Sequence, residues 1–365
     1  MDYDHIGHHI IRNNIFRRCG QAAIVGAGNN AGTYIFGNYI GETSYRYEFQ
    51  GSEPAAIKFH NGVDLIIENN YIASSNRVMG LWIDFGNQNI RVTRNFFGEL
   101  IFLEMNHGPI LIDNNILVGN YTNRGSGATT MANNLLIINK FDYEQDPYRR
   151  TRLLMINELT YIHDPFRTAG YYMPHTRNTV NRELCFIRDE RWYNNIIVNK
   201  GLDSLRAIQP DPSYLVASST SPVTTFMHLG VDPLTTNYGC AADYNLYLNG
   251  AKPHDRFDRN STVSSFNPEF SVRDQDGNVT VTLMMNEEAL TMKGPLITTD
   301  YLGVYEPMKL RMENNDGSPI ILDMDILKRR RNKDNPGVGP FADLKVGQNS
   351  FTIFTMSDKG PQLDK

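Results

Sequence analysis

The chain has 365 residues, of which 41% are hydrophobic and 21% are charged, with a formal net charge of −5 at pH 7. This length and apolar content suffice for one large globular core, and the slightly acidic balance argues against nucleic acid as a partner. No window is long and apolar enough for a membrane span.

A short motif, apolar–x–apolar–x–x–Asn–x–apolar, recurs along the chain. Its copies occupy residues 8–16, 34–41, 64–72, 89–97, 109–117 and 191–199, with a weaker copy at 132–139. Their shared asparagines are Asn14, Asn38, Asn70, Asn95, Asn115 and Asn195. Spacings of 20 to 32 residues between the first five asparagines are typical of a solenoid, and the alternating Ile and Val residues indicate strands.

The repeat predicts an all-β fold, a right-handed parallel β-helix with long loop excursions and a C-terminal strand extension. Buried asparagines at a constant turn position can hydrogen-bond to their copies in the coils above and below, which satisfies amides that are costly to bury alone. A β-sandwich rich in asparagine turns is the alternative, but it gives no reason for asparagine at a fixed phase.

The chain divides into coils and a C-terminal extension. We assign residues 1–265 to the β-helix, with excursions at about 121–190 and 204–240. The first excursion is rich in Arg and Tyr, and such a segment often builds one wall of a binding cleft. We expect residues 266–365, whose strand-like segments are separated by turn-rich stretches, to form a β extension or cap packed on the helix.

The first recognisable coil begins near His8, which leaves no room for a capping element. An uncapped coil exposes strand edges. We therefore expect that this chain is the later part of a longer protein, or that another chain covers the end, as in a homo-oligomer. The lack of a signal peptide favours the cytoplasm, although a chain that begins in a repeat leaves the compartment open.

A second strand in each coil carries polar residues in register, in three copies at 56–60, 80–84 and 100–104. Alternation along a strand sends every second side chain to the same face. The inward columns are Ile57–Leu81–Ile101 and Phe59–Ile83–Leu103, and the outward columns are Lys58–Trp82–Phe102 and His60–Asp84–Glu104. Because Asp84 and Glu104 are 20 residues apart, they should lie on neighbouring coils, about 4.8 Å apart.

Two carboxylates at this spacing indicate glycoside hydrolysis. Like charges roughly 5 Å apart disfavour joint ionisation and raise one pKa. A retaining glycosidase uses such a pair, about 5–5.5 Å apart, as nucleophile and general acid/base, whereas an inverting enzyme needs about 6.5–9.5 Å. Two solvated surface acids that point apart are the alternative. We favour the catalytic interpretation because Trp82 offers a flat face on which a sugar can stack.

Five further residues are candidate substrate-binding groups. His60 could orient a carboxylate or bind a sugar hydroxyl, or be structural, and Lys58 adjoins the same column. His107 follows the second acid and could contact it, although the Gly-Pro after it equally suggests a turn constraint. His175 lies in the first excursion as a candidate for the cleft wall. Glu53 precedes the Lys58 strand and could reach the same face, with a solvated loop acid as the alternative.

Neither a metal site nor a cofactor is predicted. The three cysteines, Cys19, Cys185 and Cys240, are far apart and form no Cys-x-x-Cys motif. The His8-His9 pair does not continue as a His-Glu-x-x-His motif.

Several segments resemble the motifs of glycoside hydrolase family 120. They are GSEPAAIKFH, GLWIDFGNQNIRVTRNFF, LIFLEMNHGPILIDNNIL, the PHT of YYMPHTRNT, RDERWYNNIIV, ENNDGSPIILDMD and NPGVGPFADL, and the similarity extends from residue 1 to about 355. Members of that family are β-xylosidases built on a right-handed parallel β-helix, with a retaining mechanism. The resemblance implies that Asp84 is the nucleophile and Glu104 the acid/base. It also implies an N-terminal portion, with early coils and an inserted β-sandwich, that this chain lacks.

The expected function is release of xylose from neutral β-xylosides or xylo-oligosaccharides by double displacement. Phe85 stands where the family pattern leads us to expect Trp, so a related β-helix glycosidase of other specificity, such as an α-L-arabinofuranosidase, is an alternative. A polysaccharide lyase would need a cation-binding acid cluster beside a basic residue, and only Lys58 adjoins the column. A non-catalytic carbohydrate-binding β-helix is the third alternative.

Overall fold

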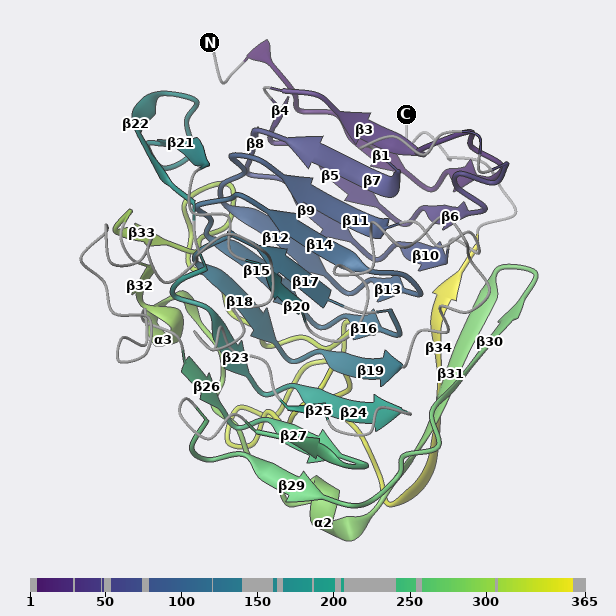
Figure 1. The fold of residues 1–365 in the computed structure, drawn as a ribbon. Coiled ribbons are helices and arrows are strands. Elements are labelled where there is room, and N and C mark those ends of the chain that lie inside the picture. Colours follow the sequence, from purple (N-terminus) through teal and green to yellow (C-terminus); the bar gives the residue numbers. More distant parts are fainter. Residues whose placement is uncertain are drawn as a thin grey trace.

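Three parallel β-sheets, wound coil upon coil, form the body of the molecule (Figure 1). The structure is a computed structural model that describes residues 5–28, 30–46, 48, 54–73, 79–119, 121–139, 160–162, 167–185, 187–200, 205–206, 241–253, 258–305 and 308–356. The chain enters the first, second and third sheet in turn, and each strand pairs in parallel with its counterpart one coil away. The predicted parallel β-helix is confirmed.

The strands of each sheet follow one another along the helix axis. Sheet 1 contains β1 (Ile10–Arg12), β5 (Tyr34–Phe36), β9 (Ile66–Glu68), β12 (Ile90–Thr93), β15 (Ile110–Asp113), β18 (Thr129–Ala132), β23 (Arg191–Tyr193) and β26 (Ala241–Asp243). Sheet 2 contains β2 (Ile15–Phe16), β6 (Tyr39–Gly41), β10 (Tyr71–Ala73), β13 (Phe96–Phe97), β16 (Ile116–Leu117), β19 (Leu135–Asn139), β24 (Ile196–Lys200), β27 (Leu246–Leu248) and β29 (Thr262–Ser264). Sheet 3 contains β3 (Ile24–Gly26), β7 (Ala55–His60), β11 (Met79–Asp84), β14 (Ile101–Glu104), β17 (Tyr121–Arg124) and β20 (Thr160–Ile162).

The repeated asparagines form a continuous hydrogen-bonded ladder at the corner between sheets 1 and 2. The backbone N–H and the side-chain amide of each asparagine donate to the Oδ1 of the next, at 2.8–3.1 Å. The ladder runs through Asn14, Asn38, Asn70, Asn95, Asn115, Asn134, Asn195 and Asn245 and ends on the hydroxyl of Ser261. The predicted stacking is confirmed, and the weak copy at 132–139 contributes Asn134.

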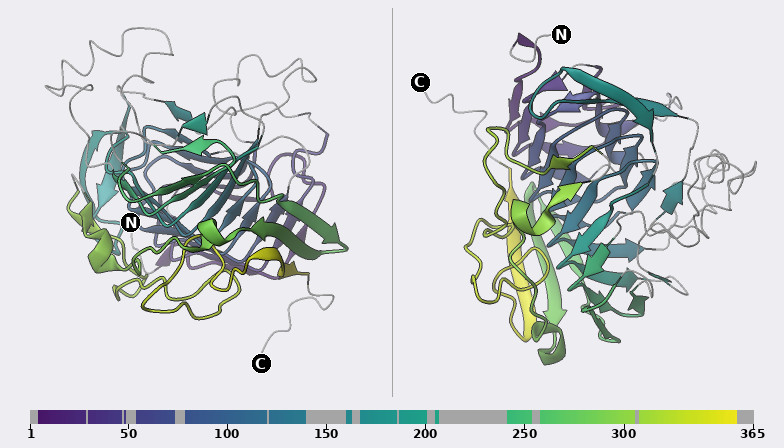
Figure 2. Two further views of the ribbon diagram at one scale, coloured as in Figure 1. Left: turned by 90° about the horizontal axis from the view of Figure 1, so that it is seen from below. Right: turned by 90° about the vertical axis from the view of Figure 1, so that its left-hand side faces the viewer.

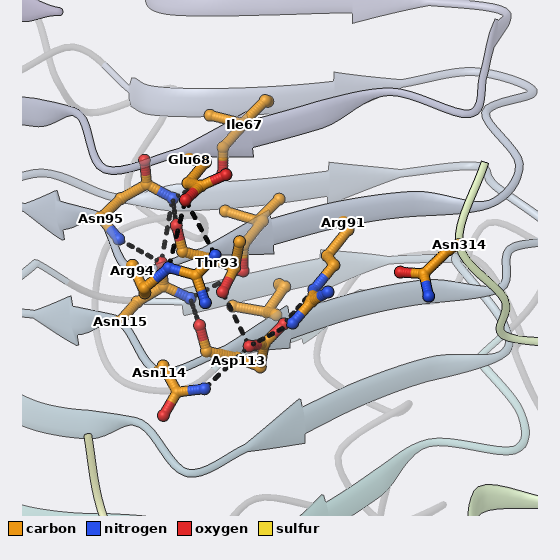
Figure 3. A network of polar contacts seen from close by, with 12 residues as sticks. Ile67, Glu68, Arg91, Thr93, Arg94, Asn95, Asp113, Asn114, Asn115 and Asn314 are labelled. Carbon is orange, nitrogen blue, oxygen red and sulfur yellow. Dashed lines mark hydrogen bonds and ion pairs between the residues drawn. The ribbon is translucent and has the colours of Figure 1, made fainter. Parts of the chain in front are cut away.

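Charged residues cover this corner on the outside of the ladder (Figure 3). Arg91 and Thr93 both donate to the carboxylate of Asp113, which is fully buried. Arg94 donates to Glu68 on the neighbouring coil at 2.8 Å. Burial acts to raise the pKa of Glu68, but the Arg94 guanidinium and further hydrogen bonds lower it to about 2. These ion pairs satisfy the buried acids of the corner, so loss of one basic partner would leave an uncompensated buried charge.

The C-terminal segment lies along the helix and covers two of its three faces (Figure 2). An antiparallel sheet of β30 (Ser271–Gln275), β31 (Asn278–Met285) and β34 (Gly347–Thr355) packs its apolar side on the outer face of sheet 2. The chain around α3 (Thr299–Leu302) packs against the outer face of sheet 1. On the third face, the outward side of sheet 3, lie the side chains of Asp84 and Glu104.

The shorter elements connect or extend these layers. They are β4 (Asn30–Ala31) paired with β8 (Gly62–Val63), β25 (Leu205–Arg206) paired with β28 (Ala251–Lys252), β32 (Val304–Tyr305) paired with β33 (Leu310–Arg311), and α2 (Glu287–Leu290). No helix in the described ranges has the length and apolarity that a membrane crossing requires.

The first excursion begins later than the expected residue 121. Strands β17, β18 and β19 add a further coil that continues to Asn139. A hairpin of β21 (Thr168–Tyr172) and β22 (Thr179–Leu184) then stands out from the coils (Figure 1). Residues 140–159 of this excursion, and residues 207–240 of the second, lie outside the described residues.

Candidate active site

Four polar residues end four successive strands of sheet 3 and form one column. Asp84 pairs in register with His60 on one side and with Glu104 on the other, and Glu104 pairs with Arg124. Each acid ends its strand because the next residue, Phe85 or Met105, adopts a positive φ, 51° and 52° respectively, which a strand cannot continue. The parallel register expected from the sequence is confirmed.

The alternation of inward and outward columns is confirmed as well. Ile57, Leu81 and Ile101, together with Phe59, Ile83 and Leu103, belong to the central core inside the coils. The outward residues are nevertheless largely shielded from solvent, since Asp84 is 8% exposed and Glu104 is 5% exposed. Buried carboxylates need charge partners or hydrogen bonds. Both acids have them, and the partners differ.

Asp84 is held by two basic side chains of the preceding coil. The Lys58 Nζ lies 2.9 Å and the His60 Nε2 lies 2.8 Å from the same oxygen, Oδ2 of Asp84. Lys58 is almost fully buried, whereas the His60 side chain is one-third exposed. These two contacts give the Asp84 carboxylate a fixed orientation.

Glu104 is held by two arginines from different parts of the chain. The Arg124 Nη1 lies 3.1 Å and the Arg167 Nη1 lies 3.2 Å from Oε1 of Glu104. Arg124 belongs to the next coil, and Arg167 directly precedes β21 in the first excursion. Burial, followed by the nearby charge of Asp84, raises the pKa of Glu104, although Arg124, Arg167 and Lys58 act in the opposite direction. The net result is that protonation of Glu104 is favoured relative to an ordinary glutamate.

An aromatic row runs beside the acids. The Lys58 Nζ lies 3.1 Å from the centroid of the Trp82 ring, and the Trp82 and Phe102 centroids lie 5.2 Å apart. The Trp82 side chain is only 7% exposed. Trp82 therefore packs between its neighbours in this structure, and a stacking role toward a sugar depends on the small part of the ring that solvent reaches.

We expect Lys58→Met to destabilise the protein strongly. The change keeps the length of the side chain but leaves the buried Asp84 carboxylate without its ammonium partner, which costs about 3–5 kcal/mol. Urea unfolding of both proteins at neutral pH measures the difference. The double variant Lys58→Met/Asp84→Asn should recover part of the loss, because it removes both charges. An unchanged unfolding midpoint for Lys58→Met would show that the ion pair does not support the fold.

His107 is buried beneath the β21–β22 hairpin. Its Nε2 lies 3.0 Å from the carbonyl oxygen of Ala169, its Nδ1 lies 3.4 Å from Arg188, and Tyr171 packs edge-on against the ring. The sequence suggested a contact between His107 and Glu104. These contacts are instead made with the hairpin and the residues that flank it. Burial, with the charge of Arg188, lowers the pKa of His107 to about 4.

This buried histidine should make the protein sensitive to acid. A pKa lowered from 6.5 to about 4 corresponds to about 3 kcal/mol, which stabilises the fold above pH 6.5 and is lost as the pH falls through 4. The free energy of unfolding, measured with a chemical denaturant, should decrease between pH 7 and pH 4. We expect this decrease to be about 3 kcal/mol smaller in His107→Gln than in the unaltered protein. His9→Gln, which alters an exposed histidine, is the control. An equal pH dependence in all three proteins would refute this role.

The structure brings His175 to a different place from the two acids. Its ring nitrogens lie 3.0 Å from Oδ1 of Asp64 and 3.3 Å from Oε2 of Glu313, so the residue connects the hairpin, a coil corner and the C-terminal segment. It lines a cavity of about 210 Å³ together with Gln88 and Arg311. Glu53 lies outside the described residues.

The sequence analysis did not identify Arg124 and Arg167, the two arginines that contact Glu104. Arg124 is the fourth member of the column, and its position, 20 residues after Glu104, would have revealed it. Arg167 has no such signal, because an excursion carries no repeat. No group of three or more His, Cys, Asp or Glu side chains in the described ranges is placed to hold a metal ion.

A solved structure of another protein is similar to this chain over most of its length. No family model matches the chain, and no curated protein sequence matches it. The solved structure of XylC in complex with xylose is similar to this chain, with a TM-score of 0.76 and 28% sequence identity over 96% of the chain. This likeness to a xylose complex agrees with the family resemblance seen in the motifs. The chain spans about half of XylC, covering 52% of its length.

Proposed function

We propose that this chain carries the active site of a retaining glycoside hydrolase that releases xylose from β-xylosides or xylo-oligosaccharides. The observation that supports this most strongly is the parallel register of Asp84 and Glu104 on neighbouring coils. Neighbouring strands lie about 4.8 Å apart, near the carboxylate spacing of retaining enzymes. The likeness to XylC, whose structure holds xylose, supports the sugar class.

The different surroundings of the two acids suit two different roles. In the first step, the Asp84 carboxylate attacks the anomeric carbon while Glu104 gives its proton to the leaving glycosidic oxygen, so the C–O bond breaks as the glycosyl–Asp84 ester forms. In the second step, the Glu104 carboxylate takes a proton from water. The water oxygen then attacks the same carbon and releases Asp84.

The basic residues support both steps. Lys58 and His60 hold the attacking carboxylate in place and leave its other oxygen, Oδ1, for the sugar. Arg124 and Arg167 face the carboxylate that remains when Glu104 has given up its proton. The raised pKa of Glu104 keeps the group protonated to higher pH than an ordinary glutamate, which is what a general acid requires.

A panel of nitrophenyl glycosides tests the proposal and its alternatives. We expect the β-D-xylopyranoside to be the best substrate. Preference for the α-L-arabinofuranoside would indicate a glycosidase with the same mechanism but a different sugar specificity. An unsaturated product that absorbs ultraviolet light, formed from an acidic polysaccharide, would indicate a lyase instead. Binding of xylo-oligosaccharides without hydrolysis of any substrate would indicate a carbohydrate-binding β-helix.

A further inference from the structure

A second polar ladder lies at the corner between sheets 3 and 1, immediately after the two acids. The backbone N–H and the side-chain amide of Asn87 both donate to Oδ1 of Asn106 at 2.9 Å. Asn106 donates in the same two ways to the hydroxyl of Ser126, at 3.1 and 3.0 Å. On the other side, the backbone N–H of Gly62 donates to Oδ1 of Asn87 at 2.8 Å. The ladder thus crosses four coils.

This ladder holds the backbone on which both acids stand. The Asn106 amide donates to the carbonyl oxygen of Ile83, next to Asp84, at 2.8 Å, and to that of Glu104 at 3.1 Å. The Asn87 amide donates to the carbonyl oxygen of Asp84 at 2.8 Å. One buried side chain, Asn106, therefore connects both acid-bearing strands at the point where each strand ends.

We infer that Asn106 is a positioning residue that sets the separation of Asp84 and Glu104, an inference that rests on the proposed function. Regular strand pairing stops at the two acids, because the next residue of each coil has left-handed backbone geometry. Beyond that point the backbone bond from the Gly86 N–H to the Met105 carbonyl oxygen, at 3.0 Å, and the corner amides of Asn87 and Asn106 continue the register. A misplacement of about 1 Å can cost on the order of 100-fold in rate, and the separation also decides whether a water fits between the acids.

The first ladder supplies a matched control, Asn115. Its backbone N–H and amide donate to Asn134, and its amide also donates to the carbonyl oxygens of Val92 and Asp113 at 2.9 Å. The backbone N–H and the side-chain amide of Asn95 both donate to Oδ1 of Asn115. Asn87 donates to Oδ1 of Asn106 in the same way. Both asparagines are fully buried, and Asn115 lies at the opposite end of its sheet 1 strand, between sheets 1 and 2. A purely structural role predicts equal effects at the two sites.

The test compares Asn106→Ala with Asn115→Ala. We expect similar decreases in the thermal unfolding midpoint. We expect kcat on an aryl β-xyloside to fall about 10- to 100-fold in Asn106→Ala, with KM little changed, and to stay near the unaltered value in Asn115→Ala. Equal kcat values for the two variants would overturn the inference. If either variant fails to fold, the pair Asn106→Ser and Asn115→Ser replaces it, because Ser126 and Ser261 already serve as ladder residues.

A second readout does not depend on turnover. The pKa of Glu104 depends first on its burial and then on Asp84, Arg124, Arg167 and Lys58, the charged groups that face it. Its titration can be followed by NMR with ¹³C-labelled glutamate and assigned with Glu104→Gln. It should move toward that of an ordinary glutamate in Asn106→Ala and stay unchanged in Asn115→Ala. If the unaltered protein is inactive, but the titration of Glu104 shifts in Asn106→Ala and not in Asn115→Ala, the proposed function is refuted and the positioning role is supported. An active parent whose Glu104 titrates alike in both variants would refute the positioning role alone.

Discussion

Asp84→Asn should abolish hydrolysis of every substrate that the unaltered protein cleaves. The amide has nearly the shape of the carboxylate but cannot form the glycosyl ester, so both steps of the double displacement are lost. Removal of a catalytic nucleophile costs on the order of 10⁶-fold in kcat in a well-characterised hydrolase. We therefore expect a loss of at least about 10⁴-fold, including on substrates with the best leaving groups. Initial rates on 2,4-dinitrophenyl β-xyloside measure it.

The fold of this variant needs its own control, because Asp84 is the partner of the buried Lys58. Circular dichroism and thermal unfolding should show a folded but less stable protein. The double variant Lys58→Met/Asp84→Asn should be more stable than Asp84→Asn and equally inactive. Residual turnover above one-hundredth of the original rate in a folded Asp84→Asn protein would remove Asp84 from the role of nucleophile.

Glu104→Ala should produce a loss that depends on the leaving group. A poor leaving group, such as an alkyl alcohol, requires a proton in the first step, and proton transfer of this kind contributes about 10²–10⁴-fold. A dinitrophenolate leaves without a proton, so the glycosyl–Asp84 ester should form and accumulate. Azide, which needs no general base, should then rescue turnover and yield a β-xylosyl azide. Pre-steady-state bursts and product analysis measure these effects.

The pH profile gives an independent check on Glu104. Because its pKa is raised, the unaltered protein should lose kcat/KM as the pH rises through that pKa, since the deprotonated form cannot act as the acid. This alkaline limb should be absent in Glu104→Ala with a dinitrophenyl substrate. An equal loss on all leaving groups, without rescue by azide, would show that Glu104 is not the acid/base.

The coil repeat and the acid column were predictable because both follow a constant period. Asn14 to Asn195 identify one corner, and alternation about the apolar columns fixes the register of Asp84 against Glu104. A ladder asparagine recurs once per coil, and so does the outward strand position that Asp84 and Glu104 occupy, so a single chain carries its own alignment. The family resemblance rests on the same segments.

The remaining features depend on contacts that have no period. Arg167 reaches Glu104 from an excursion, and the C-terminal segment covers sheets 1 and 2 through contacts between residues hundreds of positions apart. The second ladder is hard to detect because its members, Gly62, Asn87, Asn106 and Ser126, are not all asparagines. Its spacing also varies, since two residues of positive φ follow Asp84 and only one follows Glu104. The shielding of Trp82 by Lys58 and Phe102 likewise becomes visible only in three dimensions.

The anomeric configuration of the first sugar released tests the central claim most directly. Hydrolysis of an aryl β-D-xyloside should be followed by ¹H NMR from the first seconds, before mutarotation mixes the anomers. If Asp84 and Glu104 act as a closely spaced retaining pair, β-xylose appears first and α-xylose only later. If α-xylose appears first, the enzyme inverts configuration, and Asp84 and Glu104 do not form a retaining pair.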